Sequence, residues 1–510
     1  MLSHRRMFIV LFALIMLVVF TGSSEAIPAF SRQYGTSCST CHLDFPKLND
    51  FGKAFKDAGF KFPKDDESFI KIPPVLLGAQ ANKELFPHSI WPGSIPGSIP
   101  IGLRYNQFFQ VVSANRNNFN LQDTTGNPAN QQFIPRTDFQ AGFFSIFTAG
   151  NFGSDIAFWV DDDFSVGGAN AAGGLGDGYL KFVNIGRFFK LPTDALSLRV
   201  GQFELDLPFS QARTWNLSGW DIYGQPNIGI SGVQNVNNAF SLANAAHGVE
   251  FSGGHQYRGY HYSLAIVDQN TGQPVGSGTN VKPQVTYTSD SNFKDIYARF
   301  AYRFNLERDP TSRNEIQAAG ATGPRDHTYL SLGTLYFYGR SVQRFQGPGG
   351  SSMVLTSREP FYRVGGDFNF NYHTFNLFGQ FLYGRDQNIF PLQPPGSPAH
   401  FSGGFLEADY LLYPWIMAIM RWDRVNSTAD FLNNIGADQN SPPPTPFFSS
   451  VSTVRNRITP GIQFLIHANI KTSFEYQIRP RQIVYSPSTG TPITNPFRTN
   501  SAVAGLEFVY

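Results

Sequence analysis

The 510-residue chain has no long apolar run beyond its N-terminus. A membrane-spanning helix needs about 20 predominantly apolar residues, and the mean hydropathy of the chain is only −0.21. These absences exclude a bundle of transmembrane helices.

Charge is also scarce. Charged residues make up 15% of the chain, and 39 Lys+Arg against 37 Asp+Glu give a net charge of +2. An ordinary soluble domain has about 25% charged residues, and a nucleic-acid partner would require a basic surface. Aromatic residues reach 15%, with 50 Phe, and Gly numbers 49. This composition is typical of a transmembrane β-barrel and predicts no nucleic-acid partner.

The N-terminus has the pattern of a secretory signal, which we place at residues 1–26. Arg5 and Arg6 precede an apolar stretch over residues 7–20, and Ser24 and Ala26 supply small residues for cleavage. Because a lipid anchor would need a cysteine at the cleavage point and the first cysteine lies at position 38, the sequence disfavours a lipoprotein.

The chain has two cysteines, Cys38 and Cys41, and His42 follows them directly. C-x-x-C-H is the haem c attachment pattern: each thiol adds to one vinyl group, and the imidazole becomes the proximal iron ligand. A zinc site needs more ligands, and a thioredoxin-type pair needs a βαβ context. The sequence therefore predicts one covalently bound haem c on Cys38 and Cys41, with His42 on the iron.

A short helix is expected after this motif. Asp44 is a candidate N-cap, Pro46 suits the first turn, and Gly59 suits the end. Phe51 and Phe55 lie at helical spacing and give the helix one apolar face.

The segment Pro28-Ala29-Phe30-Ser31-Arg32-Gln33-Tyr34-Gly35 before Cys38 resembles the N-terminal signature of the fused monohaem cytochrome–porins of the outer membrane. That family is best known from iron-oxidising bacteria. Ser31 and Tyr34 stand where its pattern usually has Ala and Thr, which favours the wider group over the iron-oxidising branch. The resemblance implies a small cytochrome domain joined to a barrel that passes electrons across the outer membrane.

From about residue 101, apolar and polar residues alternate along segments of about 10 to 13 residues, for example over 296–304, 362–370 and 470–478. This pattern predicts strands with lipid outside and water inside. We expect sixteen, at 101–113, 136–149, 154–163, 177–185, 195–204, 247–253, 257–268, 294–305, 327–339, 359–371, 373–384, 403–412, 414–424, 455–466, 469–480 and 500–510.

Connections after odd-numbered strands are mostly long and those after even-numbered strands mostly short, apart from 306–326. Long loops outside and short turns in the periplasm fit this alternation. The alternating C-terminal end, with a final aromatic Tyr510, resembles an outer-membrane assembly signal. Both termini are then expected on the periplasmic side.

The predicted fold class is all-β: an outer-membrane transmembrane barrel of about 16 strands, preceded by a small, mostly helical c-type cytochrome domain. The expected domains are the signal peptide at 1–26, the cytochrome at 27–62, a Pro/Gly-rich linker at 63–100 and the barrel at 101–510. A barrel of this width leaves room for the haem domain to fold inside as a plug.

Two functions stay open. An electron conduit would take electrons from an extracellular donor such as Fe(II) to a periplasmic cytochrome or other electron carrier, which would make the chain an Fe(II) oxidase. A diffusion porin would use the haem domain as an accessory plug or sensor. A haem peroxidase is disfavoured, because the haem domain and linker contain only His42 and His88 and show no acid–base pair.

The sixth iron ligand has one candidate in the linker. No Met lies between His42 and the first strand, whereas His88 lies in a Pro-bounded segment that can return to the haem. His255, His373 and His467, near predicted periplasmic turns, are the alternatives.

Covalent haem attachment is testable on a denaturing gel. We expect a haem-stained band at the size of the mature chain and no band for the Cys38→Ala/Cys41→Ala double variant, since only thioether bonds survive denaturation. Staining that persists in the double variant would contradict the assignment.

Overall fold

The computed structural model describes residues 29–63, 66–77, 84–85, 87, 94–97, 99–112, 137–140, 143–153, 155–165, 174–210, 216–224, 242, 245–268, 293–306, 328–346, 354–386, 399–427, 454–478, 483–485, 492–494 and 500–510. The predicted signal peptide, the connection 306–326 beyond Leu306, and His88 lie outside these residues.

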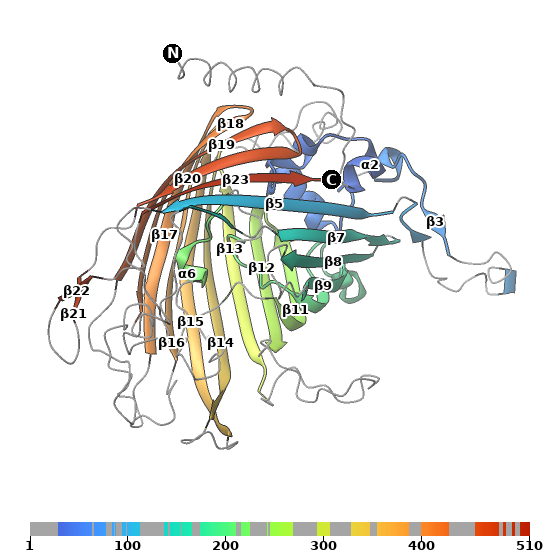
Figure 1. Cartoon of the computed structure of the whole chain (residues 1–510). Helices are drawn as coiled ribbons and strands as arrows, with labels where there is room; N and C mark the ends of the chain where they lie inside the picture. The colour runs from blue at the N-terminus through green and yellow to red at the C-terminus, as the bar shows by residue number, and fades with distance from the viewer. Residues whose placement is uncertain are drawn as a thin grey trace, which may run out of the picture.

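The molecule is built on a closed antiparallel barrel of sixteen strands. Figure 1 shows its long strands side by side around the wall. β6 and β7 both pair with β5 and together form one broken strand. The barrel strands are β5 Ile101–Val112, β6 Thr137–Gln140, β7 Phe143–Phe152, β8 Ile156–Ser165, β9 Gly174–Phe182, β10 Ser197–Phe203, β11 Ala246–His255, β12 Arg258–Asp268, β13 Asp295–Asn305, β14 Tyr329–Gln346, β15 Val354–Tyr372, β16 Phe375–Asp386, β17 Ala399–Tyr413, β18 Ile416–Ser427, β19 Val454–His467, β20 Ile470–Gln477 and β23 Ser501–Val509.

All sixteen predicted strands are confirmed, with ends that differ by a few residues in most cases. β14 and β15 are longer than expected. β14 continues to Gln346 rather than ending at residue 339, and β15 begins at Val354 rather than at residue 359. The barrel closes where the last strand, β23, pairs with the first, β5, with Leu506 opposite Gln107. Closure leaves no free strand edge in the wall.

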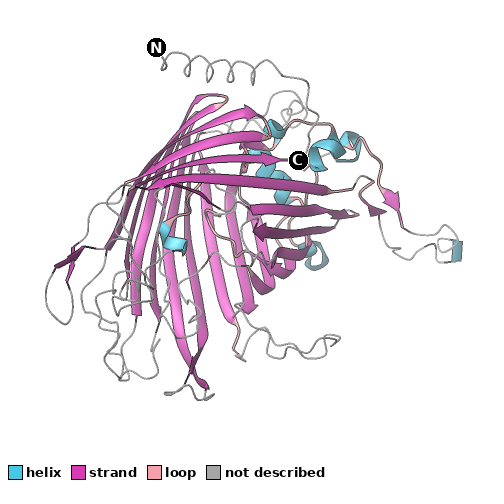
Figure 2. Cartoon of the chain, viewed as in Figure 1, coloured by secondary structure: helices cyan, strands magenta, loops and turns pink. Residues whose placement is uncertain are grey.

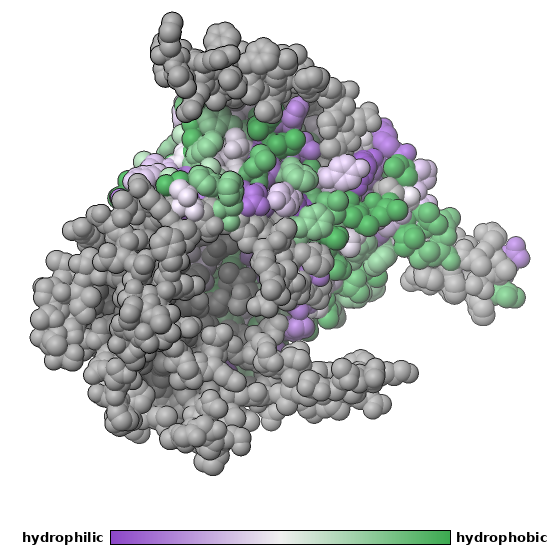
Figure 3. All heavy atoms as spheres, in the orientation of Figure 1, coloured by the Kyte–Doolittle hydropathy of each residue, from purple (hydrophilic) through white to green (hydrophobic). Residues whose placement is uncertain are grey.

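The two faces of the wall differ as the alternation predicted. On β13, Phe300 is 50% exposed, whereas the neighbouring Arg299 and Arg303 are buried. Figure 3 shows apolar side chains over the outer wall near β5 and β7. A closed barrel with an apolar exterior and a polar interior can span a bilayer, because its backbone groups are all paired and its outer side chains contact lipid. The protein therefore lies in the outer membrane.

Helices are few and short, as Figure 2 shows. Within the described ranges, none is long and apolar enough to cross a membrane. The elements outside the barrel are α2 Ala29–Tyr34, η1 Cys38–Thr40, β1 His42–Asp44, β2 Lys47–Leu48, α3 Asp50–Asp57, α4 Asp66–Phe69, β3 Val75–Leu76, β4 Ser94–Ile95, η3 Ile185–Phe189, α6 Asp221–Gly224, β21 Ile483–Tyr485 and β22 Pro492–Thr494.

The expected start of the helix after the haem motif is wrong. Residues 42–48 form a small antiparallel pair, β1 and β2, and α3 begins at Asp50. Asn49 is the N-cap, and its side-chain Oδ1 accepts a hydrogen bond from the Gly52 N–H at 2.9 Å. Asn49 therefore supplies the cap that we assigned to Asp44. Gly59, at φ 77°, follows the helix end as expected.

The Pro/Gly-rich segment 63–100, which we expected to be extended, has regular structure among its described residues. β3 pairs with β4, with Val75 opposite Ile95. Gly97 lies so close to this hairpin that an added Cβ would be 1.9 Å from the Pro73 carbonyl oxygen. The linker therefore contains a short hairpin of its own.

The sequence did not reveal that the described residues between β10 and Gly224 fold into the barrel. We call the described parts, 205–210 and 216–224, the inward segment. The Leu217 and Ser218 N–H groups donate to Glu475 on β20, and the Trp220 indole donates to Glu407 on β17 at 2.8 Å. Leu205, Trp220, Ile222 and Tyr223 join a buried apolar cluster with inward side chains of the wall. This cluster crosses the lumen.

Barrel closure gives a direct test. We expect deletion of residues 506–510 to abolish heat-modifiable gel mobility, because it removes the part of β23 that pairs with both β5 and β20. The matched control deletes residues 434–438, between β18 and β19, and should keep the heat shift. A folded, heat-modifiable product of the first deletion would show that closure does not depend on this end of the strand.

Candidate haem site and plug

Residues 29–62, which we call the plug, have an aromatic core. Tyr34 stacks on Phe62 at 4.3 Å between ring centroids, and Phe55 contacts Phe30 edge-on at 5.0 Å. Tyr34, Phe51, Phe55, Phe60 and Phe62 are all buried. The aromatic residues that α3 and the flanking segments carry therefore pack against one another.

The same aromatic cluster continues into the barrel wall. Phe60 lies 5.7 Å from the Trp159 ring of β8, and Ala149, Ala157 and Val183 complete the contact. Gly59 makes the close approach possible, since an added Cβ would be 2.6 Å from a methyl group of Val183. The plug is thus packed against the barrel by apolar contacts.

Ion pairs and hydrogen bonds hold the opposite side of the plug. Both Asp50 carboxylate oxygens accept from Arg303 of β13, at 2.7 and 2.5 Å. Lys47 donates to Asn376 of β16 at 2.6 Å, and Lys471 of β20 donates to the Phe45 carbonyl at 3.0 Å. Asn376 and Lys471 lie near strand ends that short turns connect, and Arg303 lies opposite Gly259 of β12, just after the short turn between β11 and β12. The plug therefore occupies the short-turn mouth of the barrel, as Figure 1 shows for its blue helices.

Burial by itself would raise the pKa of Asp50, but Lys53 and Arg303 outweigh it and hold that pKa at about 2. Asp50 is nearly inaccessible and stays ionised at neutral pH. The plug therefore carries a permanent buried anion against Arg303.

The two cysteines lie on a turn that other plug residues fix. η1 spans Cys38–Thr40, and the Cys41 N–H donates to the Cys38 carbonyl at 3.2 Å. The Asn49 amide donates to the carbonyls of Ser39 and Thr40, and its backbone N–H donates to the Cys41 carbonyl. Gly52 packs on Cys41 so closely that an added Cβ would be 2.2 Å from its carbonyl oxygen.

Asn49 and Gly52 are therefore positioning residues that sequence reasoning missed. An N-cap Asn followed by an acidic Asp50 in the first turn, just before the helically spaced Phe51 and Phe55, is a signal that could have identified the true helix start.

His42 is held in a form suited to a metal. Its ring Nδ1 lies 3.2 Å from the Pro46 carbonyl oxygen, and burial lowers its pKa to about 4. A neutral imidazole that donates from Nδ1 keeps the lone pair of Nε2 available as a ligand. Cys38 and Cys41 are both free, and burial raises the pKa of Cys41 to about 12. Two free thiols and a neutral, oriented imidazole fit the chemistry of haem c attachment.

The alternative distal ligands share the end of the barrel with the plug. His255 ends β11, His373 lies in the turn between β15 and β16, and His467 ends β19. The Gln256 N–H next to His255 donates to Asp57 of α3 at 3.1 Å. The structure therefore places His255 beside the end of α3, and the distal position stays a prediction.

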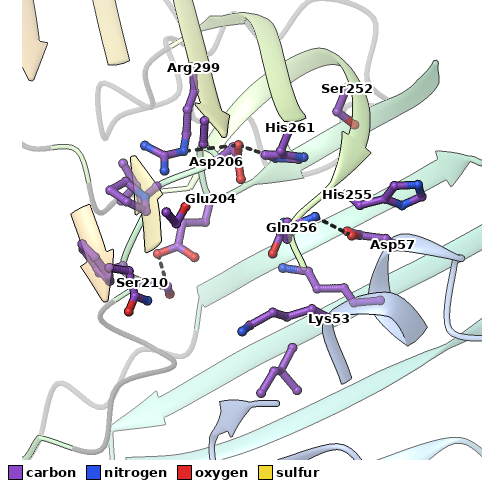
Figure 4. A pocket seen from close by; sticks show the side chains of 18 of the residues that line it. Lys53, Asp57, Glu204, Asp206, Ser210, Ser252, His255, Gln256, His261 and Arg299 are labelled. Atoms are coloured by element: carbon purple, nitrogen blue, oxygen red, sulfur yellow. Dashed lines mark hydrogen bonds and ion pairs between the residues drawn. The ribbon is translucent and has the colours of Figure 1, made fainter. Parts of the chain in front are cut away.

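A cavity of about 260 Å³ separates the plug from the inward segment. Figure 4 shows Lys53 and Asp57 of the plug on one side and Glu204, Asp206 and Arg299 on the other. His261 and Arg299 both pair with Asp206, at 2.8 and 3.8 Å. Cys38, Cys41 and His42 are not among the residues that line this cavity, so it is separate from the predicted haem site.

No protein-family model and no curated protein matches the chain. Among solved structures, the chain is similar to the outer membrane channel DcaP of Acinetobacter baumannii, at 10% identity and a TM-score of 0.42 over 80% of this chain and 96% of that one. It is also similar to an anion-selective porin from Comamonas acidovorans, at 10% identity and TM-score 0.44 over 81% and 99%. A third similar structure is OmpF of Salmonella typhi, at 10% identity and a TM-score of 0.46 over 80% of this chain and 97% of that one.

The Asp50–Arg303 pair generates a prediction. We expect Asp50→Asn to leave Arg303 buried without its counter-charge and to weaken the seated plug by about 3–5 kcal/mol. The measurement is the rate of limited proteolysis within residues 29–62 of the folded protein in detergent. Lys294→Gln, which breaks an exposed pair with Asp268, is the control and should change the rate little.

The same pair sets a pH dependence. Since the pKa of Asp50 is lowered in the folded state, its stabilisation is present above the unfolded pKa of about 4 and is lost as pH falls towards about 2. In the unsubstituted protein, the rate of limited proteolysis within the plug should rise as pH falls from about 4 to about 2. In the Asp50→Asn variant this rate should not change over the same pH range. An equal loss of protection in the unsubstituted protein and in Asp50→Asn would show that titratable groups other than Asp50 cause the pH dependence.

Proposed function

We propose that this porin-like outer-membrane barrel carries one haem c on its plug and transfers electrons across the membrane. An extracellular donor, for which Fe(II) is the candidate, would supply the electron, and a periplasmic cytochrome or similar carrier would accept it. The short-turn end then faces the periplasm, which puts the plug within reach of such a carrier.

The observation that supports this proposal most is the state of the C-x-x-C-H turn. Two free thiols lie on a turn fixed by Asn49 and Gly52, and the Pro46 carbonyl orients His42. Cys38 and Cys41 would hold the porphyrin through thioether bonds, and His42 Nε2 would bind its iron. The bound haem supplies a one-electron centre.

The obstructed lumen also favours electron transfer. The plug lies at the short-turn mouth, and the inward segment crosses the lumen beyond it, held by Glu407, Glu475 and Asp423. An electron can tunnel through packed protein over a short distance, whereas a hydrated solute needs an open path. A lumen that holds these two described segments suits a redox centre better than bulk diffusion.

A diffusion porin with an accessory haem plug is the second candidate, and the barrel by itself supports that function more directly than electron transfer. The lumen has a cavity lined by both cations and anions, among them Lys53, Arg299, Asp206 and Glu204. A charged constriction of this kind is how a pore selects ions. The porin reading needs only that the plug leave a path beside it.

The decisive experiment combines two measurements on one preparation of the full-length protein. Absorption spectra are taken before and after addition of Fe(II) at the growth pH, and conductance is recorded in planar bilayers. For an electron conduit we expect reduced c-type bands after Fe(II) addition and little or no conductance. Conductance steps without haem reduction would replace this function with the porin.

The Cys38→Ala/Cys41→Ala variant is the control for the spectra, since it should lose the bands without losing the barrel. Heat-modifiable mobility of the variant verifies that the barrel has folded. A plain electron-transfer role is wrong if Fe(II) leaves the haem of the unsubstituted protein oxidised and other one-electron donors also fail.

A further inference from the structure

A groove of about 660 Å³ lies in the outer face of the wall formed by β14 to β18. Its floor consists of glycines, Gly366, Gly379 and Gly404, which lie on adjacent strands. Its sides are large apolar residues that are partly exposed on the barrel exterior: Leu332, Phe381, Leu406 and Trp422. Glycines in place of bulky side chains leave a hollow in a surface that otherwise projects apolar groups into lipid.

One cation lines this groove. Arg424 of β18 lies opposite Gly404 on β17 and alternates with the inward Asp423 and Val425, which places it on the outer face. It forms no hydrogen bond or ion pair with any residue that the structure describes, whereas Arg421, on the inward face, pairs with Asp423 at 2.9 Å. Arg424 is therefore a charge that faces the membrane without a protein counter-ion in the described wall.

The depth of Arg424 follows from the strand. Arg424 lies eight residues from Ile416, where β18 leaves its short turn. At about 3.3 Å per residue and a tilt of about 40°, this is roughly 20 Å from the short-turn end. The apolar band of such a barrel is about 25 Å tall. Arg424 thus lies near the far edge of the band, at the level of lipid headgroups on the long-loop side.

A second cation lies on the same face. Arg385 of β16 lies two and four residues after Tyr383 and Phe381, so it is on the same outer face of the strand. In the strand register it lies opposite His400 of β17. Its buried Nε atom has no hydrogen-bond partner among the described residues. A guanidinium in this position is stabilised by an anion, and guanidinium groups bind phosphate through two parallel hydrogen bonds.

We propose that the groove binds a phosphorylated acyl lipid of the outer leaflet, with its phosphate on Arg424 and an acyl chain over Gly366, Gly379 and Gly404. Cations at the headgroup level beside a membrane-depth apolar hollow match the two ends of such a lipid. Arg385, whose β17 partner His400 is four residues further toward the long loops than Gly404, the partner of Arg424, adds positive charge on that side of the groove. A water-soluble anion would contact Arg424 but would leave the apolar part of the groove unoccupied.

The test uses native mass spectrometry of the full-length protein in detergent, with bisphosphorylated lipid A as the probe. Dephosphorylated lipid A and phosphatidylglycerol serve as comparison probes. We expect lipid A to bind and Arg424→Gln to weaken it about tenfold, as for the loss of one charge-assisted contact. Arg258→Gln, at the start of β12 at the opposite end of the barrel, is the matched control and should leave binding unchanged.

A second variant tests the apolar end of the site. Gly366→Leu should fill the hollow and reduce lipid A binding, and it should fold, because an added Cβ at Gly366 meets no atom closer than 3.7 Å. Val200→Leu, on the outer face of β10, is the control for added apolar bulk. Heat-modifiable mobility verifies folding of every variant.

Three outcomes overturn the proposal. They are unchanged lipid A binding in both Arg424→Gln and Gly366→Leu, equal binding of the dephosphorylated lipid, and equal binding of phosphatidylglycerol. The last result would show a general affinity for anionic lipid rather than for the phosphorylated lipid of the outer leaflet.

Discussion

The pairing of β23 with β5 is the interaction on which the rest of the structure depends. In a bilayer every backbone N–H and C=O group must be satisfied within the protein, and only closure of the sheet achieves this. Leu506 opposite Gln107 and Phe508 opposite Tyr105 align the last strand with the first. Closure then fixes which side chains point inward, and so creates the lumen that receives the plug.

Because the lumen is enclosed, polar side chains that point into it must find partners there. Arg303 pairs with Asp50 of the plug, and Lys471 donates to the Phe45 carbonyl. Glu475 accepts a hydrogen bond from the inward segment. Each of these contacts satisfies a buried group of the wall. The plug and the inward segment are therefore integral parts of the barrel interior, and their seating follows from the same constraint as closure.

The proposed function depends on what this arrangement brings together. The C-x-x-C-H turn is fixed within the plug by Asn49 and Gly52, and the plug is fixed at the mouth by Asp50 and Lys47. A cofactor attached there would have a defined position relative to both faces of the membrane. Defined distance is what electron transfer requires, and the lipid proposed for the groove at Arg424 would add a second specific contact, on the outer face of the same barrel.

The sequence by itself determined the sixteen strands and the haem motif. Alternation of period two is a local property, so Ile296, Phe300 and Phe304 could be assigned to the lipid face without any knowledge of the neighbouring strands. Cys38, Cys41 and His42 form a recognisable pattern for the same reason, since the haem c prediction rests on their spacing alone.

Only the tertiary structure decided what fills the lumen. Asp50 and Arg303 are 253 positions apart, and Trp220 and Glu407 are 187 apart. Neither partner carries a local signal of the other. The start of α3 at Asp50 was missed because Asp44 and Pro46 are also acceptable at a helix start, and the tertiary contacts of Asn49 with the cysteine turn favour the later one. Long-range pairing of buried charges is the information that local pattern does not contain.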